Sequence, residues 1–103
     1  MIVGEFLYRR KKLYLKRDEY VLGKRVAITV HDRHGNHEAT LSCNIREVEL
    51  PDENCFIVKV WSENEKLAEA IKKADIFEDT GLTIETGHVI APIWRVRQSG
   101  KGN

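Results

Sequence analysis

The chain has 103 residues, which is enough for one modest hydrophobic core and too little for two independent domains. Hydrophobic residues make up 42% and charged residues 32%, with seven glycines and two prolines, so the composition excludes a disordered, collagen-like or low-complexity protein. The formal net charge of +1 indicates no class of partner by itself. We expect a single folded unit over residues 1–97 and a flexible tail over 98–103, where the chain has no apolar anchor.

The pattern of charge and apolar residues leads us to expect neither a membrane span nor a secretory signal. The uncharged apolar runs, such as residues 26–30, are far shorter than the roughly 18 residues that a membrane span requires. Residues 1–7 lack a long apolar stretch and are followed by positive charge, which reverses the order of a secretory signal. Cys43 and Cys55 allow at most one disulfide, and we expect both to be reduced and buried. These features predict a cytoplasmic protein with no membrane partner.

Positive charge gathers at the two ends of the chain. Residues 1–25 carry eight basic and three acidic side chains, residues 88–103 carry three basic and no acidic ones, and the middle is acidic. The densest cluster comprises Arg9, Arg10, Lys11 and Lys12. Such a cluster, with tyrosines nearby, suits contacts with a nucleic-acid backbone and its bases. An exposed hairpin turn, in which charge protects a strand edge, explains the cluster equally simply, and this second interpretation is favoured.

Alternating apolar and polar residues predict three hairpins. The first is a basic hairpin within residues 1–24, on either side of the charged turn. The second pairs residues 26–30 with 39–45 around Gly35 and Asn36, and its apolar face includes Leu41 and Cys43. A turn at 51–54 leads to a core strand at 56–61. The third hairpin joins residues 82–84 to 89–96 through Gly87.

One helix is predicted over residues 62–74. Ser62 and Glu65 have the spacing of a capping box, and Leu67 and Ile71 belong to a single apolar stripe. The sequence therefore predicts an α+β fold, in which one helix packs on one face of a mainly antiparallel, twisted sheet of five to six strands. We expect Leu67 and Ile71 to share one core with Cys43 and the apolar face of the second hairpin.

No pattern in the sequence indicates catalysis. His31, His34 and His37 recur at three-residue intervals, but on a strand or tight turn this spacing directs the rings to different sides, so a polar hairpin tip is favoured over a metal site. No local hydrolase signature and no phosphate-binding glycine loop are present. We expect no enzymatic activity, no cofactor and no metal.

Four segments resemble a family of small uncharacterised bacterial proteins that is found on phage, plasmids and other mobile elements. They are residues 39–45, 61–65, 76–81 and 86–95, within a similarity that spans residues 25–97. The family has no settled chemistry. The resemblance implies a genomic setting, that of accessory or anti-defence genes, and not a mechanism.

These observations lead to two hypotheses for function. The favoured one is a binding protein that modulates or inhibits a host protein, as an anti-defence or anti-CRISPR-like accessory factor. Its candidate contact residues are Trp94 and Arg95, because Pro92 predicts that their strand lies at an exposed edge or carries a bulge. The alternative is a nucleic-acid-binding accessory protein that uses the basic segment Arg9–Lys12.

Overall fold

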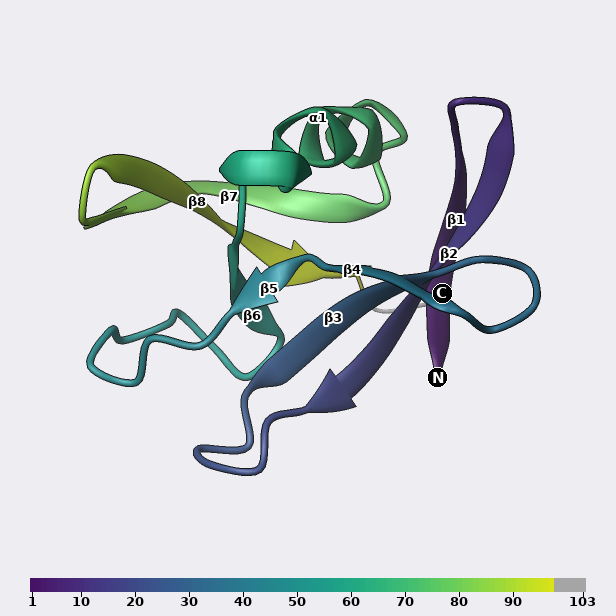
Figure 1. The fold of residues 1–103 in the computed structure, drawn as a ribbon. Coiled ribbons are helices and arrows are strands. Elements are labelled where there is room, and N and C mark those ends of the chain that lie inside the picture. The colour runs from purple at the N-terminus through teal and green to yellow at the C-terminus, as the bar shows by residue number, and fades with distance from the viewer. Residues whose placement is uncertain (98–103) are drawn as a thin grey trace.

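The structure, a computed structural model, describes residues 1–97, and the tail expected at 98–103 lies outside the described residues. Two four-stranded antiparallel sheets and one α-helix make up this part of the chain (Figure 1). The first sheet contains, in order, β1 (Ile2–Tyr8), β2 (Lys11–Glu19), β3 (Val26–His31) and β4 (His37–Thr40). The second contains, in order, β5 (Ser42–Cys43), β6 (Cys55–Val58), β8 (Val89–Val96) and β7 (Phe77–Thr86). A 3-10 turn (Ser62–Asn64) and α1 (Glu65–Lys73) connect β6 to β7.

The α+β class, the antiparallel pairing and the helix are confirmed, but the prediction of one sheet of five to six strands is wrong. The return strand of the second hairpin leaves the first sheet and enters the second at Leu41. The amide of Leu41 donates to the carbonyl of Ile28 at 2.9 Å, and its own carbonyl accepts from the amide of Lys59 at 2.7 Å. Alternation along a strand shows which side chains share a face, but it does not show where the strand changes partner.

This change of sheet also alters which side chains beyond Leu41 are buried. Simple alternation would put Ser42 on the face opposite Leu41, yet Ser42 is 3% exposed. Its hydroxyl accepts from the amide of Ile28 and hydrogen-bonds to Tyr20. Cys43 is half-buried and packs against a smaller cluster around Cys55, so the prediction that it joins the main core is wrong. The other members of the expected core do share one cluster: Val26, Ile28, Val30, Leu41, Leu67 and Ile71.

The helix is shorter than predicted and begins differently. Ser62 has a φ of 59° and makes no capping hydrogen bond, so the predicted capping box is wrong. Asn64 takes the structural role instead. Its side chain is 1% exposed and donates to the carbonyls of Thr40, at 2.8 Å, and Lys59, at 3.2 Å. A buried side-chain amide therefore ties the start of α1 to both sheets.

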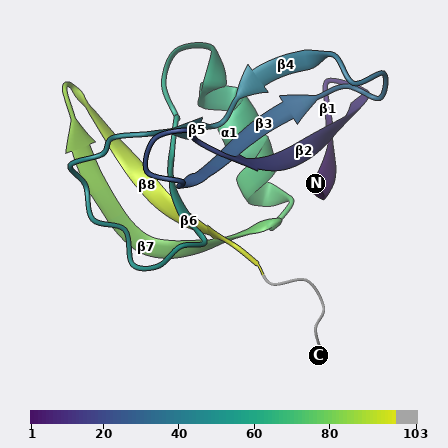
Figure 2. The same ribbon diagram turned by 90° about the horizontal axis from the view of Figure 1, so that it is seen from below.

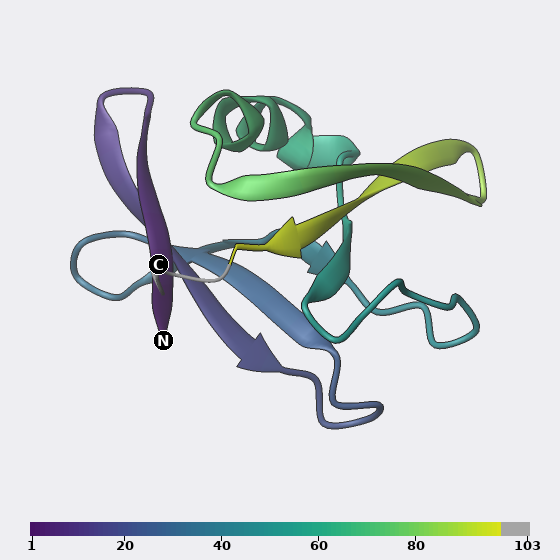
Figure 3. The same cartoon turned by 180° about the vertical axis from the view of Figure 1, so that it is seen from behind.

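The helix lies between the β7–β8 hairpin and β1 (Figures 1, 2 and 3). Leu67, Ala68 and Ile71 are its buried residues, and they face the main core. The third hairpin, predicted from residue 82, begins earlier, at Phe77. No helix within residues 1–97 has the length and apolar character needed to cross a membrane.

The packing of α1 generates the first prediction. Ile71 is fully buried in the main core, so Ile71→Ala should lower the free energy of unfolding by about 2–5 kcal/mol through lost contacts and a residual cavity. Glu69→Ala, on the exposed side of the same helix, should change it by less than about 0.5 kcal/mol. Denaturant melts measure both, and a small loss for Ile71→Ala would contradict this packing.

Candidate functional site

The basic turn of the first hairpin consists of Arg9 and Arg10. Tyr8 pairs with Lys11, so these two arginines alone connect β1 to β2. Both have positive φ, 52° and 66°, as a type I′ turn requires. Glycine and asparagine adopt this conformation most easily, whereas a longer side chain there costs about 1–3 kcal/mol. The hairpin therefore carries two arginines at its tip in a backbone conformation that is unfavourable for them.

A second turn lies beside this tip. β2 pairs with β3 only from Tyr14, opposite His31, so the first hairpin extends beyond β3 at the end where residues 32–36 turn. Both turns lie at the same end of the first sheet (Figures 1 and 2). Between them is a hollow of about 430 Å³, and the residues that line it are Arg10, Lys11, Lys12, Asp32, Arg33 and His34. We call Arg10, Lys11, Lys12 and Arg33 the basic surface. The guanidinium of the neighbouring Arg9 lies over the ring of Tyr8, 5.0 Å from its centroid.

Among residues 1–97, Asp32 is the one carboxylate that lines this hollow, and its oxygens accept hydrogen bonds within the turn. They accept from the backbone amides of His34 and Asn36, both at 2.9 Å, and from the Asn36 side chain at 3.1 Å. The amide of Asn36 is the main reason why the pKa of Asp32 is lowered. Asp32 therefore shapes the β3–β4 turn and holds Arg33 beside the first hairpin.

The cations of the basic surface are held weakly. Lys11 lies 3.3 Å from Glu38 and Lys12 lies 3.5 Å from Glu5, in pairs whose side chains are a third or more exposed. Exposed pairs of this kind contribute at most about 1 kcal/mol, so a phosphate can displace them. Arg10 and Arg33 form no ion pair within residues 1–97. The surface is thus available to an anionic partner.

Trp94 does not lie at an exposed edge, as the sequence predicted. β8 lies between β6 and β7, and Trp94 is 3% exposed in the main core, stacked on Phe77 and edge-on to Phe56. Pro92 is accommodated because β6 pairs with β8 only as far as Ile93, and because β7 has an irregularity next to Thr83, opposite the proline. The irregularity lies on β7, which advances four residues from Asp79 to Thr83 while β8 advances two, so the strand of Pro92 itself is neither an edge nor the bulged strand.

Arg95 is occupied by contacts within the protein. Its guanidinium donates to Asp52 at 2.9 Å and to Glu78 at 2.8 Å, and its side chain is 27% exposed. These pairs join the 51–54 turn to the second sheet. Arg95 therefore acts here as a structural clamp, with little of its charge free for a partner.

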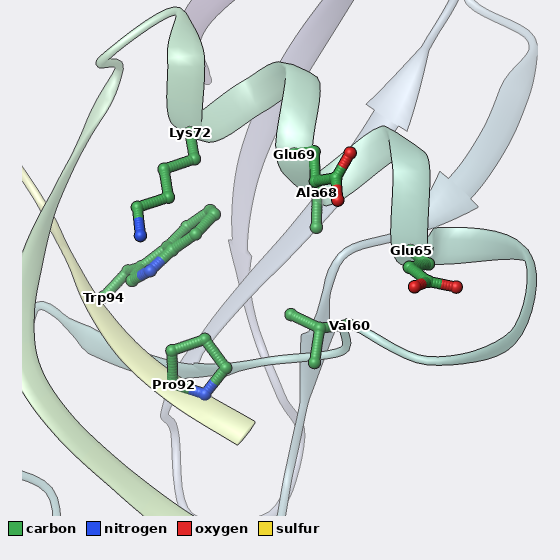
Figure 4. Close-up of a pocket in the computed structure, with 7 residues that line it drawn as sticks. All are labelled: Val60, Glu65, Ala68, Glu69, Lys72, Pro92 and Trp94. Carbon is green, nitrogen blue, oxygen red and sulfur yellow. The ribbon is translucent and has the colours of Figure 1, made fainter. Parts of the chain in front are cut away.

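A shallow groove runs between α1 and β8. Its apolar walls are Val60, Ala68, Pro92 and the edge of Trp94, and its volume is about 270 Å³. Lys72 reaches over the indole ring, while Glu65 and Glu69 lie along the outer rim (Figure 4). The indole Nε1 of Trp94 is buried and has no acceptor within residues 1–97.

The three histidines do not form a metal centre. The ring nitrogens of His31 lie within hydrogen-bond distance of the Thr29 hydroxyl and the Gly35 carbonyl, and its ring meets that of His37 edge-on at 5.5 Å. His34 lines the hollow described above. No group of three or more metal-ligating side chains is arranged to hold an ion within residues 1–97.

Both cysteines are free thiols. Cys55 is buried, as predicted, while Cys43 is only half-buried. Burial raises the pKa of each thiol, which reduces the thiolate fraction and with it the nucleophilicity. Neither cysteine therefore has the environment of a catalytic nucleophile.

Comparison of the whole chain with family models, with characterised proteins and with solved structures finds no match. The resemblance to a mobile-element family stays a prediction.

The clamp around Arg95 generates the second prediction. The pKa of Asp52 is lowered, chiefly by the amide of Asn54 and further by Arg95. A carboxyl whose pKa is lowered on folding adds stability above its unfolded pKa, near 3.9, and that stability is lost as pH falls through the folded value. In NMR titrations, Asp52 should titrate below its ordinary pKa, and Arg95→Gln should restore part of the difference. A full restoration would show that the amide contributes nothing.

Proposed function

We propose that the protein is a non-enzymatic nucleic-acid-binding protein, whose basic surface contacts the phosphate backbone. One observation carries the proposal: the end of the first hairpin and the β3–β4 turn, which are distant in sequence, bring Arg10, Lys11, Lys12 and Arg33 around one hollow. Neutralising a phosphate with a lysine or arginine releases condensed counterions, which is the main source of affinity for a nucleic-acid backbone.

The two hypotheses drawn from the sequence are not equally supported by this geometry. Trp94, a candidate contact residue for a protein partner, is buried in the core, and Arg95 is paired with two carboxylates. Arg9 to Lys12 are all exposed at the end of a hairpin. The residues predicted to contact nucleic acid are therefore accessible, while those predicted to contact a protein partner are either buried or ion-paired within the protein.

The second candidate is a protein partner seated in the groove beside α1. The unsatisfied indole Nε1 of Trp94 favours it, because a peptide carbonyl could accept that hydrogen bond if Lys72 moved aside. A buried donor without an acceptor costs about 1–3 kcal/mol, which a ligand would recover. In this case the protein would act as a modulator or inhibitor of a host defence protein, in keeping with the resemblance to mobile-element proteins.

The nucleic-acid proposal gives the third prediction. Lys12→Gln with Arg33→Gln should weaken binding to a labelled oligonucleotide and reduce the slope of log affinity against log salt concentration. The expected reduction is about 1.4 for a single strand or about 1.8 for B-form duplex, because each neutralised phosphate contributes about 0.7 or 0.9. Fluorescence anisotropy over a series of salt concentrations measures both effects.

A matched control removes the same charge elsewhere. Lys66 and Lys73 are exposed residues of α1, so Lys66→Gln with Lys73→Gln alters the net charge equally but leaves the basic surface intact. This control should retain most of the affinity and the full salt slope. Equal losses in both variants would mean that only net charge matters, and the absence of salt-dependent binding in the wild type would refute the proposal.

The protein-partner candidate gives the fourth prediction. Glu69→Lys reverses an exposed charge on the rim of the groove without touching the core. If the groove binds a protein, a partner captured from nuclease-treated host lysate should be lost with this variant and retained with Lys12→Gln plus Arg33→Gln. Capture that disappears on nuclease treatment alone would instead favour nucleic acid.

A further inference from the structure

The first sheet has an outer face that neither core cluster covers. Successive side chains of a strand point to opposite faces, and on β2 the buried residues are Leu13 and Leu15. Lys12, Tyr14 and Lys16 therefore share the opposite face. Tyr14 is half-buried, belongs to neither apolar cluster and makes no side-chain hydrogen bond within residues 1–97.

A row of rings crosses this face. Tyr14 lies directly opposite His31 on β3, and His31 pairs with His37 on β4. Side chains directly opposite each other on antiparallel strands have Cβ atoms about 4.5–5.5 Å apart, which is close enough for their rings to meet. The ring centroids of His31 and His37 are 5.5 Å apart. Three strands thus contribute three rings to one stripe, and two of the rings are in contact.

The stripe adjoins the basic surface. On β2, Lys12 is two residues from Tyr14 and so lies on the same face, about 7 Å along the strand. Its partner on β1 is Leu7, which is 71% exposed and adds an apolar contact area. The hollow lined by Lys12 and Arg33 follows at the end of the strands. Rings, an exposed aliphatic side chain and cations therefore form one continuous surface.

We propose that this outer face binds the bases of a single-stranded nucleic acid, with Tyr14 and His31 as stacking residues and the basic surface holding the adjoining phosphates. The inference rests on the nucleic-acid function proposed above and specifies the substrate class. Bases of a single strand are free to stack on aromatic rings, and this stacking tolerates any sequence. In a duplex the base faces are stacked on each other, so rings on the surface of a sheet cannot reach them.

The acidic residues on this face determine where the backbone runs. Glu5 lies opposite Tyr14 on β1 and 3.5 Å from Lys12, and Asp18 lies 3.9 Å from Lys16. These carboxylates repel phosphate, so the middle of the sheet is left to the bases. The strong positive end at Lys12 and Arg33 then receives the phosphates. Glu5→Gln should consequently tighten binding, since it removes a repulsion and frees Lys12.

The test uses the wild-type protein and three oligonucleotides of equal length: single-stranded oligo(dT), the same backbone with abasic sites in place of the bases, and a duplex. Stacking contributes about 1–3 kcal/mol per base, so the abasic strand should bind about 5- to 150-fold more weakly for each stacked base. The duplex should bind only through its salt-dependent backbone contacts. Equal affinity for all three oligonucleotides would overturn the stacking proposal while leaving the basic surface intact.

Substitutions at Tyr14 assign the effect to the sheet face. Tyr14→Phe should keep the affinity for oligo(dT), while Tyr14→Leu should lose about 5- to 150-fold and leave abasic binding unchanged. Denaturant melts confirm that both variants are folded. If Tyr14→Leu is neutral towards oligo(dT), this face does not bind bases. If no oligonucleotide binds in a salt-dependent manner, the proposed function itself fails, which is a different outcome.

Discussion

The arrangement of the two sheets depends on the backbone around Leu41. Its amide donates to Ile28 of β3 and its carbonyl accepts from Lys59, the residue after β6, while its side chain is fully buried. The neighbouring carbonyl of Thr40 accepts from Asn64, and the neighbouring hydroxyl of Ser42 accepts from Ile28. These bonds connect both sheets and the start of α1 within three residues. The groove beside α1 and the free outer face of the first sheet both follow from that junction.

Local periodicity predicted which side chains are buried more reliably than which strands pair with each other. Val26, Ile28 and Val30 share the main core with Leu67 and Ile71, as alternation and helical spacing indicated. The two-sheet arrangement was not predicted, because the Ala39–Ile45 alternation does not mark the point where pairing changes. The predicted edge position of Trp94 is wrong because a proline indicates only that its strand lacks one hydrogen-bond donor. In the structure the pairing of β6 with β8 stops at Ile93, so Pro92 is tolerated in a central strand.

Only part of the candidate site could be predicted from the sequence. Arg9 to Lys12 stand out as a cluster in the sequence, but Arg33 and Tyr14 are isolated residues there. Their relation to the cluster comes from the register that places Tyr14 opposite His31 and lets the first hairpin extend beside the β3–β4 turn. A register of this kind is a long-range property. Hydrophobic pattern constrains which face each strand buries, but it leaves the neighbour of each exposed side chain open.

The backbone conformation of Arg9 and Arg10 indicates why the turn between β1 and β2 carries positive charge. Protection of a strand edge requires charged side chains along β1, where the unpaired backbone groups lie, yet Arg9 and Arg10 are in the turn beyond the strand. Solubility alone would be served by charges at positions where the backbone is relaxed. Two arginines with positive φ, where asparagine and glycine are preferred, oppose local stability. Strain of this kind is typical of functional positions, and here it places Arg10 in the wall of the hollow that Arg33 completes.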